Sequence, residues 1–121
     1  MSFKNVEDRL NPATPEGVDD TTLGGYLQVH GRAAAFEGVD GRPYTVAVEA
    51  EETGGPGAPW VGYLVFPRWA DTGTAVMGHV ETGDLAEGES ERDVRAALDS
   101  LPLARVRQIL DDTIERRQRE E

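Results

Sequence analysis

His79 and Glu81 are the residues whose types and spacing best suit metal binding or acid–base chemistry, because they form the pattern His-x-Glu. In an extended strand, residues two positions apart share a face and lie ~7 Å apart. A zinc site takes at least three protein ligands. The second histidine, His30, is expected on the first strand of a sheet, ~14 Å from the fourth strand if the strands follow chain order. The sequence therefore predicts no metal site and no cofactor.

Arg68 and His79 are the other candidates for joint action on a substrate. If they pair across a turn centred on residues 71–73, Arg68 lies beside Ala75 and His79 lies beside Leu64. Arg68 and His79 are then ~13 Å apart along the ladder, too far to act on one reacting atom. The chain has no cysteine, no Gly-x-Ser-x-Gly motif and no lysine after its Gly-Gly-Pro-Gly segment. Its serines stand at the N-terminus or at expected helix ends: Ser2, Ser90 and Ser100. These features favour a non-enzymatic protein.

The charge of the chain argues against two classes of partner. The 121 residues carry a formal net charge of -11, and Lys4 is the single lysine. Such a surface repels phosphate groups, so neither a nucleic acid nor an anionic membrane is expected as a partner. No run of ~20 apolar residues is present for a membrane helix, and the N-terminus lacks the apolar core of a secretory leader. Together with the absence of cysteine, this predicts a cytoplasmic protein.

The composition divides the chain into an arm and a domain. Residues 1–22 are rich in Asn, Pro, Asp, Glu and Thr and are predicted to form a flexible acidic arm. Residues 23–121 are predicted to form a single domain, which fits the length of the chain. In the arm, Phe3, Val6 and Leu10 stand at helical spacing. They suit a short amphipathic turn that docks on the domain, and a frayed tail is the alternative.

Four strands are predicted, at about residues 26–37, 43–52, 60–68 and 74–81. Asp40-Gly41 is a strong hairpin-turn signal between the first two strands. The third strand begins with a segment that is apolar on both faces, which is typical of an interior strand. An even-length loop in the first hairpin is expected to put the apolar residues of strand one on the face of Tyr44 and Val46, namely Leu27, Val29, Ala33 and Ala35.

Two helices are predicted near the C-terminus, at about residues 91–100 and 103–118. Ser90 suits the N-cap of the first helix, and Pro102 suits the start of the second. Strands followed by helices, without alternation, indicate the α+β class. The predicted fold is thus a four-stranded antiparallel meander with two helices packed on one face.

The predicted functional surface is the sheet face that the helices leave uncovered. The second hairpin is expected to gather on this face the residues Trp60, Leu64, Phe66, Arg68, Met77 and His79. An uncovered apolar patch usually marks an interface. We therefore expect a protein-interaction or self-associating module, with a protein partner or a second copy bound here, unless the N-terminal arm covers the patch. The alternative is a small-ligand-binding protein or an enzyme with a pocket near His30, Arg68, His79 and Glu81.

Overall fold

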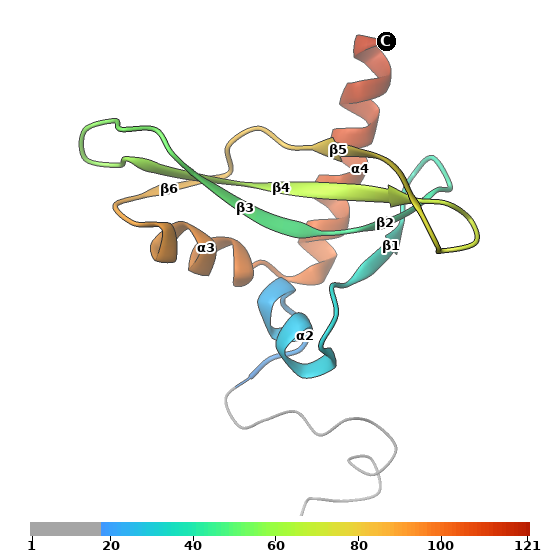
Figure 1. Cartoon of the computed structure of the whole chain (residues 1–121), viewed down its shortest axis with the longest axis horizontal. Helices are drawn as coiled ribbons and strands as arrows, with labels where there is room; N and C mark the ends of the chain where they lie inside the picture. The colour runs from blue at the N-terminus through green and yellow to red at the C-terminus, as the bar shows by residue number, and fades with distance from the viewer. Residues whose placement is uncertain (1–17) are drawn as a thin grey trace, which may run out of the picture.

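The computed structural model describes residues 18–121, and this part of the chain is α+β, with one antiparallel sheet and three helices (Figure 1). This confirms the predicted fold class. The sheet has six strands where four are predicted. The predicted docking residues of the arm, Phe3, Val6 and Leu10, lie outside the described residues.

The strand β4 (Trp60–Trp69) is the centre of the sheet. On one side it pairs with β2 (Pro43–Thr45) and β3 (Ala47–Glu52), and β1 (Ala35–Glu37) lies outside β2. On the other side it pairs with β5 (Val76–Glu81) and β6 (Ala86–Gly88). The predicted meander is therefore present, with its second strand interrupted at Val46 and with β6 added after β5.

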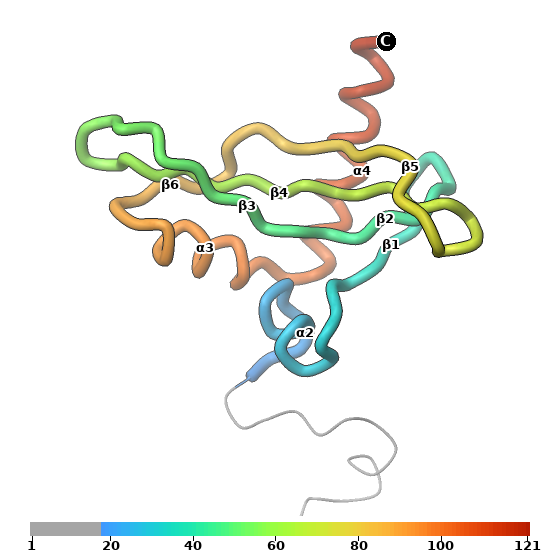
Figure 2. The backbone as a smooth tube through the Cα atoms, in the orientation of Figure 1, coloured from blue at the N-terminus to red at the C-terminus, as the bar shows by residue number. Residues whose placement is uncertain are grey.

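The loops of the sheet lie at its two ends. Figure 2 shows that the loop 53–59, between β3 and β4, and the loop 70–75, between β4 and β5, project at opposite ends of β4. The first loop is closed by the Thr53 amide, which donates to the Pro59 carbonyl at 2.6 Å. The second is closed by the Ala70 amide, which donates to the Ala75 carbonyl at 2.8 Å.

The hairpin of β1 and β2 forms where Asp40-Gly41 predicts a turn, but its parity differs from the prediction. The Gly38 amide donates to the Arg42 carbonyl at 2.8 Å, and Phe36 pairs with Tyr44. Residues 38–42 are an odd-length loop, so Ala35 pairs with Thr45 and does not share the face of Tyr44. A change of parity moves side chains to the other face of a strand, and the even-length expectation is wrong.

The N-terminal half of the predicted strand 26–37 is instead the helix α2 (Leu23–His30). The Thr22 hydroxyl accepts a hydrogen bond from the Gly25 amide at 3.1 Å, and Gly31 ends the helix in a left-handed conformation with φ 69°. A Cβ atom at Gly24 would lie 2.6 Å from the Cβ of Asp99, so close packing on the next helix requires glycine there. Tertiary packing thus outweighs the low helix propensity of glycine.

The two C-terminal helices are confirmed: α3 (Glu91–Asp99) and α4 (Leu103–Glu120). The Ser90 hydroxyl caps α3 by accepting a hydrogen bond from the Asp93 amide at 3.1 Å. Figure 1 shows α4 running behind the strands, with its C-terminal end extending past β5.

The helices pack on the face of β4 that carries Gly62, Leu64 and Phe66. A Cβ atom at Gly62 would lie 2.9 Å from Cδ1 of Leu98 on α3, so a larger residue here requires Leu98 or α3 to shift. Leu64 and Phe66 are 0% exposed. The rest of the hydrophobic core comes from all three helices and the first strands: Leu23, Ala34, Tyr44, Val46, Leu98, Val106, Ile109, Leu110 and Ile114.

The pairing of β4 with β5 also differs from the prediction. Arg68 pairs with Gly78, and Pro67 with His79, whereas the prediction places Arg68 beside Ala75. The register shifts between Arg68 and Trp69, which is the mark of a bulge, and the loop 70–75 is longer than the predicted turn. As a result, Val80 lies on the face of Phe66, and His79 and Glu81 lie on the opposite face.

Candidate functional site

The predicted interface residues divide between the two faces of the sheet. Trp60, Leu64, Phe66 and Arg68 alternate along β4 on the face that the helices cover. Leu64 and Phe66 belong to the core and offer no surface to a partner. The predicted uncovered patch is therefore wrong at these positions, because the helices pack on the face that carries them.

The residues of the alternative pocket do not come together either. His30 lies on α2, with its Nε2 3.4 Å from Oδ2 of Asp20 and its ring 4.3 Å from that of Tyr26. Arg68 faces the helices, and His79 and Glu81 lie on the other side of the sheet. Within the described residues 18–121, no three His, Asp or Glu side chains are grouped in a way that could hold a metal ion.

The face opposite the helices carries an apolar ridge, which we call the open face. Alternate residues of β4 form it: Val61, Tyr63, Val65, Pro67 and Trp69. All are partly exposed. The indole Nε1 of Trp69 donates to the Thr45 hydroxyl at 2.9 Å, which holds the Trp69 ring beside β2. Among residues 18–121, α3 and α4 pack on the other side of the sheet and α2 packs on α3, so the ridge is accessible.

Exposed glutamates stand on both sides of this ridge, and we call them the glutamate rim. On β3, Glu49 pairs with Tyr63 and Glu51 with Val61. On the other side of β4, the partners are Glu81 of β5, opposite Val65, and Glu87 of β6, opposite Val61. Cross-strand partners project from the same face of a sheet, so the carboxylates flank the apolar ridge.

The pKa of Tyr63 reports the negative potential of the rim. Its hydroxyl donates to Oε1 of Glu51 at 2.9 Å. This hydrogen bond, then burial and the charges of Glu51, Glu81 and Glu49, raise the pKa of Tyr63 to about 12. Three carboxylates from two strands therefore act on one point of the open face.

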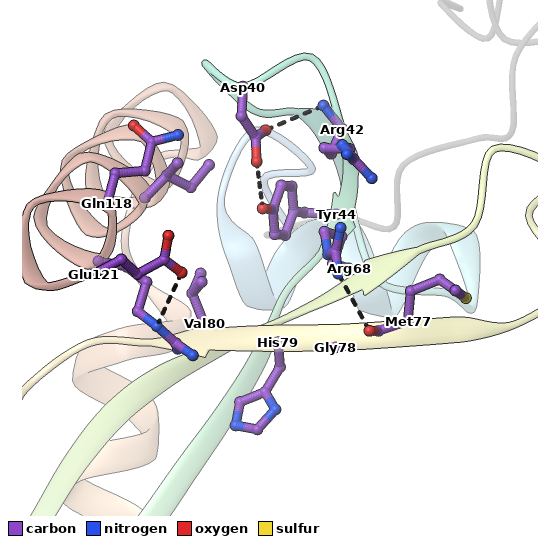
Figure 3. Close-up of a pocket in the computed structure, with 12 residues that line it drawn as sticks. Asp40, Arg42, Tyr44, Arg68, Met77, Gly78, His79, Val80, Gln118 and Glu121 are labelled. Carbon is purple, nitrogen blue, oxygen red and sulfur yellow. Dashed lines mark hydrogen bonds and ion pairs between the residues drawn. The ribbon is translucent and has the colours of Figure 1, made fainter.

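A second feature is a cavity of about 580 Å³ between the end of α4 and the strands β2, β4 and β5. It is lined by Arg42, Arg68 and Arg117, together with Tyr44 and both acidic residues Asp40 and Glu121. Figure 3 shows Arg68 and Tyr44 side by side on this side of the sheet and the imidazole of His79 pointing away from them.

Hydrogen bonds fix the polar residues of this cavity. Asp40 accepts from the Tyr44 hydroxyl at 2.8 Å and from the Arg42 amide at 3.1 Å. Burial and the bond to Asp40 raise the pKa of Tyr44 to about 12, and the charges of Arg68 and Arg42 act in the opposite direction. Both guanidinium groups are therefore close enough to affect the Tyr44 hydroxyl. Met77, 58% exposed, contributes its carbonyl, which accepts from Arg68 at 3.2 Å.

Comparison of the chain with family models, with curated proteins and with solved structures found no match. In the part of the chain that the structure describes, no helix is both long enough and apolar enough to cross a membrane.

Proposed function

We propose that this protein is a non-enzymatic interaction module whose open face binds a basic, extended segment of another protein. The partner segment carries arginine or lysine at some positions and apolar side chains at others. The observation that carries this proposal is an apolar ridge bordered on both sides by exposed glutamates.

The chemistry of the open face suits such a segment. Apolar side chains bind the ridge, and the guanidinium or ammonium groups reach the glutamate rim. The rings of Tyr63 and Trp69 add surfaces on which an arginine can stack, a contact worth about 0.5–1 kcal/mol at exposed sites. From Val61 to Trp69 the ridge spans ~26 Å at the usual rise of a strand, enough for about eight extended residues.

A second copy of the chain is a poorer occupant of this face. A two-fold interface brings the same patch of each copy together. The glutamates of one rim would then face those of the other, and like charges placed across an interface are unfavourable. The net charge of -11 adds to this repulsion.

The N-terminal segment is a poorer occupant on charge alone. Among residues 1–17, the basic side chains are Lys4 and Arg9, and the acidic ones are Glu7, Asp8 and Glu16. The two positive and three negative charges sum to -1, so this segment does not complement the rim.

The proposal is tested by titrating the ¹⁵N-labelled full chain with a synthetic peptide of alternating arginine and valine. We expect saturable amide shifts along β3, β4 and β5. The affinity should fall as the salt concentration rises from about 0.05 to about 0.5 M, because salt screens the attraction between the arginines of the peptide and the glutamate rim. The triple variant Glu49→Gln, Glu51→Gln, Glu81→Gln should bind about tenfold more weakly, since each lost ion pair at the surface is worth ~0.2–1 kcal/mol.

The matched control is Asp112→Asn, Glu115→Gln, Glu120→Gln, which removes the same charge from exposed positions of α4. It should retain most of the affinity. Equal loss in both variants would mean that the peptide responds to net charge alone, and the proposed surface would be wrong. A stable dimer in size-exclusion chromatography with light scattering, with the open face buried in it, would identify a second copy as the occupant and contradict the proposal.

A further inference from the structure

The arginine-lined cavity is unusual in so acidic a protein. The whole chain has 23 acidic and 12 basic residues, yet the side chains lining this cavity carry three positive charges and two negative ones. Within residues 18–121, neither Arg42 nor Arg68 forms an ion pair with a carboxylate. Arg117 has one, with Nε 4.0 Å from Oε2 of Glu121, but both side chains are more than half exposed and the contact is weak.

Arg68 is partly buried and has no paired carboxylate within residues 18–121, and such burial of a cation is unfavourable. A guanidinium has five N–H donors. In the described part of the chain, Arg68 uses one terminal nitrogen to donate to the Met77 carbonyl, and no other bond from its guanidinium is found. Donors of this group therefore remain for a ligand in the cavity.

Asp40 contributes one of the two negative side-chain charges of the cavity and also fixes the position of its neighbours. Its two carboxylate oxygens accept from the Tyr44 hydroxyl and the Arg42 amide. These bonds hold the loop 38–42, which carries Arg42, against the strand that carries Tyr44. Asp40 is therefore a positioning residue for the backbone of Arg42 and the ring of Tyr44, and Tyr44 pairs with Arg68 across the sheet.

We propose that this cavity binds a small oxyanion, a ligand with a phosphate or carboxylate group, through the guanidinium groups of Arg42 and Arg68. Arginine suits both groups because its planar donors match two oxygens of a phosphate or a carboxylate. The volume of about 580 Å³ falls in the range of small-molecule sites. Arg117, in the last turns of α4, offsets the negative end of the helix dipole at the edge of the cavity.

This site is separate from the open face, because Arg68 and Pro67 project from opposite sides of β4. The charges of the glutamate rim are therefore across the sheet from the ligand. At 0.1 M salt, solvent-exposed charges separated by more than ~10 Å are largely screened, which reduces the effect of the exposed glutamates on the titration.

The test is an NMR titration of the ¹⁵N-labelled full chain with inorganic phosphate in one arm and malonate in the other, each against sodium chloride at constant ionic strength. We expect saturable shifts at the amides of Tyr44, Arg68 and Gly78 in at least one arm. Arg42→Gln and Arg68→Gln should each weaken binding about tenfold or more, as removal of a hydrogen bond to a charged group does. Arg92→Gln, at an exposed position of α3, should leave the affinity unchanged.

The two arms distinguish the ligand chemistry. Saturation by phosphate alone identifies a phosphate ligand, and saturation by malonate alone identifies a carboxylate. Because Arg68 also bonds the Met77 carbonyl, Arg68→Lys serves as a second variant that keeps the charge but loses the planar fork, and we expect intermediate affinity.

If Arg68→Gln does not fold, Arg42→Gln still gives the result, since Arg42 is exposed and its side chain makes no hydrogen bond within the described residues. The proposal is overturned if neither anion gives saturable shifts at these amides, or if Arg42→Gln binds as tightly as the natural chain. Arg42→Gln should bind the arginine-valine peptide as tightly as the natural chain does. A failure of the anion site can therefore be distinguished from a failure of peptide binding at the open face.

Discussion

Alanine at Leu64 should destabilise the domain by about 3–4 kcal/mol. Leu64 is 0% exposed and lies opposite Val48 in the covered half of the sheet. Removing about three methylene equivalents costs ~2.4 kcal/mol in transfer free energy, and the cavity that remains raises the total into the range of ~2–5 kcal/mol seen for such changes. At about 4 °C per kcal/mol for a domain of this size, the melting temperature should fall by roughly 12 °C or more.

A matched pair of valines tests the assignment of the two faces. Val46 is 5% exposed in the core, and Val65 is partly exposed on the open face. Val46→Ala should cost about 2 kcal/mol, and Val65→Ala should cost less, because Val65 buries less apolar surface. Urea unfolding followed by far-UV circular dichroism at two protein concentrations measures both. If Val65→Ala is as costly as Val46→Ala, the open face is covered, and the reasoning from an accessible ridge fails.

Three further predictions follow from particular contacts. The pKa of Tyr44 is raised from 10.0 to about 12 in the folded chain, so its contribution to stability is complete below pH 10 and is lost as the pH rises through 12. In this pH range the free energy of unfolding should depend less on pH in Tyr44→Phe than in the natural chain. An unchanged dependence would contradict the raised pKa of Tyr44. Ser90→Ala removes the cap of α3 and should cost about 1 kcal/mol by urea unfolding, whereas Ser90→Asp should cost little; equal losses would rule out the capping role. Gly62→Ala places a Cβ atom 2.9 Å from Cδ1 of Leu98 and should destabilise by about 1–3 kcal/mol in a thermal melt, and a neutral result would mean that α3 moves aside readily.

The sequence predicts the parts of the fold that depend on local signals. Ser90 and the helical spacing after it predict α3, and Asp40-Gly41 predicts the first turn; both are present. The helix α2 has local signals too, the cap residues Thr22 and Gly31. Its two glycines lower the helix propensity, however, and the alternation of Leu27 and Val29 favours a strand. The structure shows that Gly24 is needed for contact with Asp99 of α3 and Gly25 for contact with the Asp19 backbone, and the first requirement arises only after the chain has folded.

The sequence could not locate the open face, because its position depends on the parity of the strands and on the side of the sheet on which the helices pack. β4 is apolar on both faces, so its sequence does not indicate which face the helices cover. The bulge after Arg68 changes the partners of β5 and exchanges its faces relative to the prediction. His79 was placed with Phe66 and lies instead across from Pro67, on the open face.

The alternation of β4 places two surfaces of opposite character on one strand. The odd-numbered residues from Val61 to Trp69 form the ridge within the glutamate rim, and the even-numbered ones fill the core until Arg68. The next residue on the covered face, Arg68, lies beyond the core and lines the cavity, so a charged side chain stands there after Leu64 and Phe66. An acidic surface and an arginine-lined cavity can coexist in this small protein because the sheet and its core separate them. The basic partner and the small anion that we propose therefore require different residues and different space.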